Sequence, residues 1–260
     1  METPQNETPT STVDPNEVAH FGKMAETWWD PKGPFKPLHK LNPTRLGYIR
    51  KTLAQHFDLT LDDDMAIDET PASLLAGLKG LDIGCGGGLL TEPLATWGAE
   101  MLGADATEKN IHIAAHHAEE NNVDVQYRHV TAEHLVEEGA QFDFIINMEV
   151  LEHVADISLF LNATHSLLKP GGIMLFSTLN RTIKSYMTAI VGAEYILRWL
   201  PKGTHHWNKF IKPSELHRAL TQQKFHVQDM EGMIYNPIND QWRLGHDLAI
   251  NYLGSALKAQ

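Results

Sequence analysis

Short apolar runs alternate with longer segments of helical spacing through the middle of the chain. The apolar runs predict strands at residues 80–84, 100–105, 125–130, 142–147 and 173–178, with two more near 227–234 and 248–253. Apolar side chains that recur every three or four residues predict helices at residues 89–97, 108–121, 157–168 and 213–222. Strands that alternate with helices indicate an α/β fold, with a mostly parallel sheet and helices on both faces.

The two ends of the chain break this alternation, and we divide the sequence accordingly. Residues 1–14 are rich in Pro, Thr and Asn and predict a disordered tail. Aromatic residues spaced among Pro and Gly in residues 15–73 predict a helical cap, with two helices around an irregular elbow. The other parts are the core at residues 74–180, an inserted amphipathic segment at 181–210, and a C-terminal helix with closing strands at 211–260.

The composition narrows the classes of function. The 260 residues carry a net charge of −12, which argues against nucleic acid as a partner because phosphate binding needs clustered Lys and Arg. Cys85 is the single cysteine, so an internal disulfide and a multi-cysteine zinc site are excluded. No apolar run reaches the ~20 residues of a membrane-spanning helix, and the first residues lack the pattern of a secretory signal or transit peptide. We therefore expect a cytoplasmic protein.

A glycine-rich loop follows the first predicted strand. Gly84, Gly86 and Gly88 give the spacing G-x-G-x-G, and glycines let the backbone adopt positive φ and approach a ligand closely. Asp105 ends the second predicted strand, about 20 residues on, where an acidic side chain binds ribose hydroxyls in nucleotide-binding folds. The pattern fits a dinucleotide or another adenosine ligand. The glycine spacing favours the second, as does Asp82, because a carboxylate suits an amino group better than a pyrophosphate.

Across residues 74–180, the loop, its acid and the order of elements resemble the class I S-adenosylmethionine-dependent methyltransferases. The resemblance implies the Rossmann-like fold of that class, with a seven-stranded sheet whose last strand is antiparallel. It also implies that Gly84 and Gly86 contact the methionine part of S-adenosylmethionine, that Asp105 binds its ribose, and that Met148 packs against it. Glu133 lies in the region that usually flanks the adenine.

Segments on both sides of the core are similar to the ubiquinone-biosynthesis O-methyltransferase family. They are residues 20–30, 35–49, 176–181, 192–197 and 201–205. The similarity implies methylation of two prenylated acceptors, a 2-polyprenyl-6-hydroxyphenol and 3-demethylubiquinol, and contact with other proteins of ubiquinone biosynthesis. It also implies that Arg45 reaches the carboxylate of the cofactor, which a planar guanidinium matches well.

Three polar residues, Glu149, Glu152 and His153, follow the fourth predicted strand near the sheet edge where ligands bind in such folds. If a helix begins there, the three share one face. The family resemblance implies that they hold a magnesium-type ion, although imidazole suits zinc, manganese or iron better. Alternatively His153 is the catalytic base, or the three are structural. A phenol has a pKa of about 10 and needs a base or a metal to react at neutral pH.

Residues 183–200 predict an amphipathic helix, with Ile183 and Ile190 on its apolar face and Lys184 and Arg198 opposite. Two interpretations are open: the helix lies on anionic lipid headgroups, or it packs its apolar face on the core. A prenylated substrate favours the first, and we expect peripheral binding to the inner membrane. Other functions also stay open: methylation of a different small molecule, a cofactor-binding scaffold, and a nicotinamide-dependent oxidoreductase.

Overall fold

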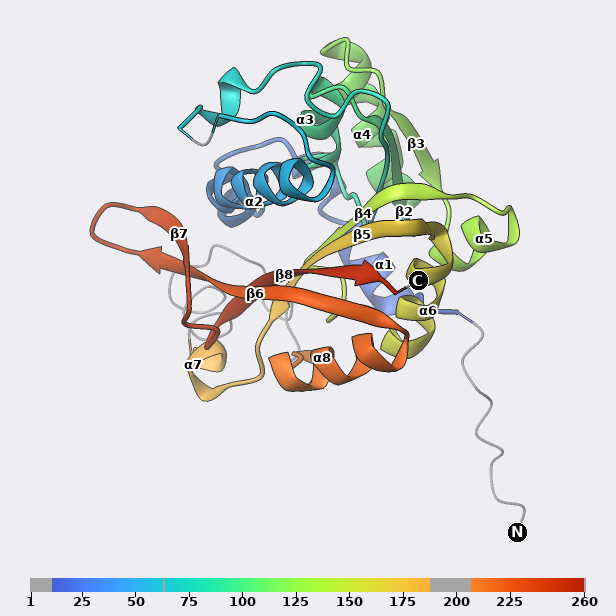
Figure 1. Ribbon diagram of the computed structural model, residues 1–260. Coiled ribbons are helices and arrows are strands. Elements are labelled where there is room, and N and C mark those ends of the chain that lie inside the picture. Colours follow the sequence, from blue (N-terminus) through green and yellow to red (C-terminus); the bar gives the residue numbers. More distant parts are fainter. Residues whose placement is uncertain (1–10, 63, 188–206, 260) are drawn as a thin grey trace.

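The computed structural model describes residues 11–62, 64–187 and 207–259. At its centre is an eight-stranded sheet in the order β3-β2-β1-β4-β5-β8-β6-β7, with helices on both faces (Figure 1). The strands are β1 (Lys79–Ile83), β2 (Glu100–Asp105), β3 (Gln126–His129), β4 (Phe142–Met148), β5 (Leu168–Leu179), β6 (Phe225–Asn236), β7 (Gln241–Gly245) and β8 (Asn251–Lys258). The first five strands pair in parallel, as expected for strands joined by crossover helices.

Helices cover both faces of this sheet (Figure 1). Those that follow the core strands are α3 (Thr91–Thr96), α4 (Glu108–Glu120), α5 (Ala132–Glu137), α6 (Ile157–Leu167) and α8 (Pro213–Gln222). Before β1 come α1 (Pro15–Gly22), η1 (Ala25–Thr27), α2 (Lys36–His56) and η2 (Ile67–Glu69). Two single turns, α7 (Ile183–Ser185) and η4 (Trp207–Lys209), lie on either side of residues 188–206. The helices α1 and α2 are the two expected on either side of the aromatic elbow.

The fold class expected from the sequence is confirmed, but the number of strands is wrong. The eighth strand, β7, forms an antiparallel hairpin with β6. Its side chains alternate between polar and half-buried apolar residues such as Trp242 and Leu244, a weak pattern typical of a strand at a sheet edge. The last strand, β8, lies between β5 and β6 and is antiparallel to both, as expected for the last strand. It spans residues 251–258, further along the chain than the predicted 248–253.

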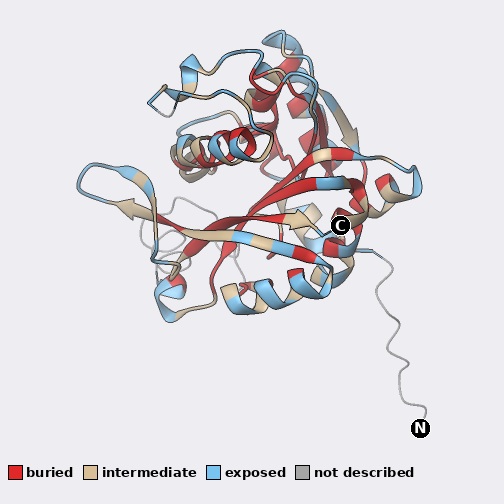
Figure 2. Cartoon of the chain, viewed as in Figure 1, coloured by how far each residue is buried: buried red, intermediate tan, exposed pale blue. Residues whose placement is uncertain are grey.

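Two apolar cores fill the spaces between the sheet and its helices. Alternate residues of the central strands point to opposite faces, so Ile145 packs into one core while Phe144 and Ile146 pack into the other. Figure 2 shows the buried residues concentrated along these central strands. The carboxyl ends of β1, β2 and β4 are therefore held by rigid packing, which fixes the position of the loops that follow them.

The segment just before α1 packs against the protein body, which differs from the disordered tail predicted for residues 1–14. Thr12 is buried; its N–H donates to Glu133 Oε1 at 2.7 Å, and its carbonyl accepts from the Ala155 N–H at 2.9 Å. Asp14 caps α1 by accepting a hydrogen bond from the Asn16 N–H at 3.0 Å. Residues 1–10 lie outside the described residues.

Within the described ranges, no helix combines the length and apolar character needed to cross a membrane. Most of the predicted amphipathic segment lies outside those ranges, from residue 188 onward. Ile183, Tyr186 and Met187, which come directly before it, are exposed. Lys184 forms an ion pair with Asp247, with 2.6 Å between Nζ and Oδ2.

Candidate functional site

The glycine-rich loop connects β1 to α3 and has the backbone geometry that its sequence predicts. Gly84, Gly86 and Gly88 have φ values of 75°, 54° and 89°, a region that favours glycine. A Cβ atom at Gly84 would lie 2.6 Å from the Val150 side chain, and one at Gly86 would lie 2.4 Å from Trp28. The absence of side chains at these positions is therefore required both by conformation and by close packing.

Asp105, at the end of β2, holds this loop in place. Its carboxylate accepts hydrogen bonds from the Gly86 N–H at 3.0 Å and from the Thr107 N–H at 2.7 Å. Asn110 donates to the same carboxylate at 3.3 Å. Burial raises the pKa of Asp105, although these hydrogen bonds act in the opposite direction. The carboxylate thus links the ends of β1 and β2 at the carboxyl edge of the sheet, where ligands bind in open α/β folds.

A cavity of about 240 Å³ opens at this edge. Most of the predicted site residues line it, namely Gly84, Gly86, Asp105, Met148, Glu149, Glu152 and His153. Side chains of the N-terminal cap close its other side, including Phe21, Met24, Trp28, Phe35 and Leu38. The cavity therefore lies between the sheet edge and the cap. The Asp105 carboxyl group, the glycine loop and the His153 imidazole all line it.

Two neighbouring tryptophans attach the cap to the glycine loop. Trp28 stacks on Phe35, with 3.7 Å between ring centroids, and its Nε1 donates to Asn110 Oδ1 at 2.9 Å. Because Asn110 also bonds to Asp105, Trp28 is linked to the ribose-binding candidate through a single side chain. Trp29 Nε1 donates to the Gly87 carbonyl at 2.9 Å. The loop is therefore supported by the cap as well as by the sheet.

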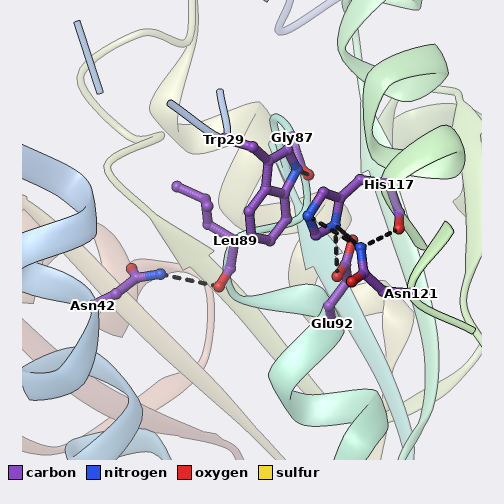
Figure 3. A network of polar contacts seen from close by, with 7 residues as sticks. All are labelled: Trp29, Asn42, Gly87, Leu89, Glu92, His117 and Asn121. Carbon is purple, nitrogen blue, oxygen red and sulfur yellow. Dashed lines mark hydrogen bonds and ion pairs between the residues drawn. The ribbon is translucent and has the colours of Figure 1, made fainter. Parts of the chain in front are cut away.

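Figure 3 shows the polar contacts around Trp29 and the glycine loop. The Trp29 ring stacks on the His117 imidazole at a centroid distance of 3.4 Å. His117 Nδ1 lies 2.9 Å from the buried Glu92 carboxylate. Burial raises the pKa of Glu92, and His117 opposes this shift. Asn42, from α2, donates to the Leu89 carbonyl at 3.0 Å. These contacts join α2, α3 and α4 around the loop.

No helix begins at Glu149, so the single helical face that would have brought Glu149, Glu152 and His153 together is not formed. Residues 149–155 form turns, α6 begins at Ile157, and Glu149 itself has a φ of 59°, a strained conformation for a residue with a side chain. The Glu149 N–H donates to the Ser177 carbonyl at 3.0 Å, and the Ser177 hydroxyl donates to Glu149 Oε1 at 2.8 Å. These bonds to β5 compete with helix formation and hold the segment as a loop.

The three residues of this loop have separate partners. Glu152 is buried and accepts from the Thr178 hydroxyl at 2.7 Å. Burial, reinforced by the neighbouring Glu149 carboxylate, raises the pKa of Glu152 well above its usual range. His153 Nδ1 instead lies 3.0 Å from Glu17 Oε2 in α1. Among the residues that the structure describes, no three His, Cys, Asp or Glu side chains come together as a metal site.

Arg45, Asp82 and Glu133 are not among the residues that line the cavity. Arg45 is buried behind Glu149, with 3.4 Å between Nη2 and Oε1, and its Nε and Nη2 have no hydrogen-bond partner among the described residues. Asp82 accepts from the Thr91 hydroxyl at 2.6 Å, and burial raises its pKa to about 7. Glu133 receives the Thr12 N–H. The last two therefore have structural partners where the sequence suggested ligand contacts.

Sequence analysis missed Glu17 and Lys209, which lie beside His153. Lys209 Nζ donates to Glu17 Oε1 at 2.9 Å and to Asp14 Oδ2 at 2.8 Å. Burial acts to raise the pKa of Glu17, but the hydrogen bonds and charges of His153 and Lys209 outweigh it and lower that pKa to about 2. The Asp14-Pro15 pair does signal the start of a helix, yet no local pattern shows which face of that helix meets His153.

Comparison with known proteins agrees with this geometry. Residues 47–229 match a family model described as a methyltransferase domain. The ubiquinone biosynthesis O-methyltransferase of Ruegeria pomeroyi is 52% identical over 249 residues, which cover 95% of this chain and 97% of that protein. The proteins of the same name from Bartonella bacilliformis and Brucella ovis are 51% and 47% identical, over 94% and 95% of this chain and 95% and 96% of theirs.

The chain belongs to the ubiquinone biosynthesis O-methyltransferase family. This confirms the resemblance found in the sequence, and the matches extend over 95% and 94% of the chain. Among solved structures, magnesium protoporphyrin IX methyltransferase from Synechocystis PCC 6803 is 20% identical, with a TM-score of 0.54 and coverage of 84% of this chain and 86% of that one. A methyltransferase from Aquifex aeolicus is 12% identical, with a TM-score of 0.55, over 92% of this chain and 98% of its own. These similarities show the fold that members of the ubiquinone biosynthesis O-methyltransferase family share with other methyltransferases.

Proposed function

We propose that this chain transfers a methyl group from S-adenosylmethionine to a phenolic hydroxyl of prenylated ubiquinone precursors, a 2-polyprenyl-6-hydroxyphenol and 3-demethylubiquinol. The observation that carries the proposal is that the glycine loop, Asp105 and His153 line one and the same cavity. Family membership and the names of the relatives give it further support. The cavity combines a surface for an adenosine-type ligand with a group that can accept a proton.

The residues around the cavity fit S-adenosylmethionine. Gly84 and Gly86 line the cavity with their backbone, and the Asp105 carboxylate can accept hydrogen bonds from ribose hydroxyls. Met148 supplies an apolar contact. The carboxyl groups of Glu149 and Asp105 suit a ligand that carries positive charge on sulfur and nitrogen. When bound, S-adenosylmethionine supplies an activated methyl group on a positively charged sulfur.

His153 is the residue best placed to activate the acceptor. A phenol with a pKa of about 10 is mostly protonated at neutral pH, so a base near its oxygen raises the fraction that can react. His153 lines the same cavity as the glycine loop and has one ring nitrogen engaged by Glu17. Its other nitrogen can then accept the phenolic proton. The apolar side chains of Phe21 and Val154 line the same cavity.

A divalent ion held by Glu149, Glu152 and His153 stays part of the sequence-based hypothesis, but the observed side chains do not fit a three-ligand set. The Arg45 guanidinium already neutralises part of the charge on Glu149, and Glu152 accepts the Thr178 hydroxyl hydrogen bond at 2.7 Å. Glu152 Oε1 is buried without a hydrogen-bond partner among the described residues, and burial raises the pKa of Glu152 well above its usual range, which favours the protonated carboxyl group over the carboxylate that a metal ion needs. The reaction steps proposed above therefore use no metal.

Peripheral membrane binding and association with other proteins of ubiquinone biosynthesis are part of the same proposal. A polyprenyl tail keeps the acceptor in the bilayer, so the enzyme must meet it there. The exposed apolar side chains Ile183, Tyr186 and Met187 support this, because they lie at the start of the amphipathic segment. Binding to liposomes of anionic lipid that weakens with added salt is the expected behaviour.

The decisive experiment is methyl transfer from labelled S-adenosylmethionine to a demethylated quinol with a short prenyl tail, measured with and without a chelator. We expect methylated product in both conditions, and loss of product with chelator would restore the metal hypothesis. Asp105→Ala should raise the Kd for S-adenosylmethionine about tenfold or more, since it removes a buried acceptor. Glu100→Gln, at the exposed opposite end of β2, is the control. Wild-type protein that does not bind S-adenosylmethionine in calorimetry would refute the proposal.

A further inference from the structure

The two ring nitrogens of His153 have different surroundings. Nδ1 lies 3.0 Å from Glu17 Oε2, whereas no described residue forms a hydrogen bond with Nε2. The ring itself lines the cavity and packs edge-on against Phe21, with 5.1 Å between centroids. Both side chains of the His153–Glu17 pair are largely shielded, at 16% and 13% exposed, so water competes little for their hydrogen bond.

Glu17 is held in place from its other side. Lys209 Nζ donates to Glu17 Oε1 at 2.9 Å, so the two carboxylate oxygens have different partners, a cation on one and an imidazole on the other. An ammonium group has donors only. Lys209 therefore requires an acceptor at Oε1, and the carboxylate offers a second acceptor to His153.

We propose that Glu17 is a positioning residue that keeps His153 protonated at Nδ1 and leaves the Nε2 lone pair facing the acceptor. A carboxylate that accepts a hydrogen bond from one ring nitrogen of a neutral histidine holds the proton on that nitrogen and leaves the other nitrogen unprotonated. This inference rests on the proposed role of His153 as base. In the reaction, the phenolic O–H bond breaks and its proton passes to Nε2. The freed electron pair on oxygen forms the new O–CH3 bond, while the electron pair of the broken S–CH3 bond stays on sulfur.

Charged and titratable groups around the pair come from three other places in the chain. Asp14 lies one turn before Glu17 and shares Lys209 with it. Glu149 and Glu152 line the same cavity from the loop after β4. Neither Asp14 nor these two glutamates forms a hydrogen bond or ion pair with His153, so Glu17 is the one carboxylate among the described residues that bonds to the ring.

The substitution Glu17→Gln gives a sharp test, because Lys209 dictates how the new amide must lie. The amide oxygen has to face Lys209, which leaves the amide nitrogen, a donor, against His153 Nδ1. The ring must then accept at Nδ1 and carry its proton on Nε2, the wrong form for a base. We expect kcat to fall about 100-fold, with the Kd for S-adenosylmethionine changed less than twofold.

Two further variants separate positioning from a purely structural role. Asp14→Asn removes the other carboxylate that contacts Lys209 but keeps a side chain able to cap α1, and it should lower kcat less than threefold. In the double variant Glu17→Gln with Lys209→Met, the amide is free to turn its oxygen toward Nδ1. We therefore expect at least tenfold recovery of kcat over Glu17→Gln alone. A structural role predicts no recovery, because the double variant loses more contacts.

Nitrogen NMR of ¹⁵N-histidine-labelled protein provides a readout apart from activity, with the His153 signal assigned by its loss in His153→Gln. Wild-type protein should show the Nδ1–H form and Glu17→Gln the Nε2–H form. The same form in both proteins would overturn the positioning role, as would equal kcat values for Glu17→Gln and Asp14→Asn. Full activity of His153→Gln would instead refute the base itself, and the NMR result would still report separately on Glu17.

Discussion

Single glycines show how the site depends on the space around one atom. Gly86 and Gly139 both have positive φ, at 54° and 72°, so an alanine at either place carries the conformational cost of the left-handed region, about 1–2 kcal/mol. Their surroundings differ. A Cβ atom at Gly139 would meet nothing within 4 Å, whereas one at Gly86 would lie 2.4 Å from Trp28. Gly86 is therefore required for the space that Trp28 occupies as well as for its backbone conformation.

Substitution at these two glycines should separate the two effects. Gly139→Ala is expected to lower the free energy of unfolding by about 1 kcal/mol and to leave the Kd for S-adenosylmethionine unchanged. Gly86→Ala should displace Trp28, disturb its bond to Asn110, and raise that Kd about tenfold or more. Urea denaturation and calorimetry measure the two quantities. Equal Kd values for both variants would show that contact with Trp28 does not matter for the cofactor.

Site residues that lie at fixed positions relative to a strand end could be predicted from the sequence. Those defined by contacts between distant parts of the chain could not. Gly84, Gly86, Asp105 and Met148 occupy fixed places relative to strand ends, and all line the cavity. The Glu17–His153 contact joins positions 136 residues apart. It depends on how α1 lies on the finished sheet, which no periodicity in residues 15–22 records.

At the scale of elements, buried polar contacts decide how the strands and helices join. Asp82 on β1 accepts from Thr91 at the start of α3 and is almost fully buried. Burial raises its pKa from an ordinary 3.8 to about 7, and the Thr91 hydroxyl opposes the shift. The folded protein therefore holds this proton more tightly than the unfolded chain does. The raised pKa of Asp82 therefore contributes to the free energy of unfolding in full below pH 4, and this contribution is lost as the pH rises through 7.

The variant Asp82→Asn tests this assignment. An amide can accept the same hydrogen bond but cannot ionise, so its stability lacks this dependence on pH. We expect the free energy of unfolding of the variant, relative to wild type, to rise steadily between pH 4 and pH 7 and then level off. Urea denaturation at several pH values measures it. A difference that stays constant over this range would mean that Asp82 ionises normally in the folded protein.

Two segments differ from what their local sequence pattern indicates, and both differences have the same physical cause. Residues 149–155 have a spacing compatible with a helix, but Ser177 on β5 binds both the backbone and the side chain of Glu149 and holds a turn instead. The hairpin strand β7 gains its burial from Trp242 and Leu244 packing in the core beside α2. In both cases tertiary contacts override a weak local pattern. The strongly apolar central strands carry their own signal, so they were predicted closely.

At the scale of the whole molecule, the site belongs to neither the cap nor the sheet alone. Cap residues such as Met24, Trp28 and Phe35 line the cavity together with Asp105 and the glycine loop. A ligand in this space touches both parts and so must stabilise their contact. The hairpin of β6 and β7 takes no part in the cavity lining and lies at one edge of the sheet (Figure 1). Ligand binding should therefore leave its hydrogen exchange unchanged, and it can serve as an internal reference.

Hydrogen exchange in the presence of S-adenosylhomocysteine should reveal this coupling. At 100 times its Kd, a ligand that binds only the closed form stabilises it by about 2.7 kcal/mol, which slows exchange through opening about 100-fold. We expect this slowing in α1 and the elbow as well as in the glycine loop, because opening either side of the cavity releases the ligand. Amides of β7 should exchange at the same rate with and without it. Protection confined to the glycine loop, with α1 and the elbow unchanged, would mean that the cap opens independently of the cofactor and that access to His153 is not linked to cofactor binding.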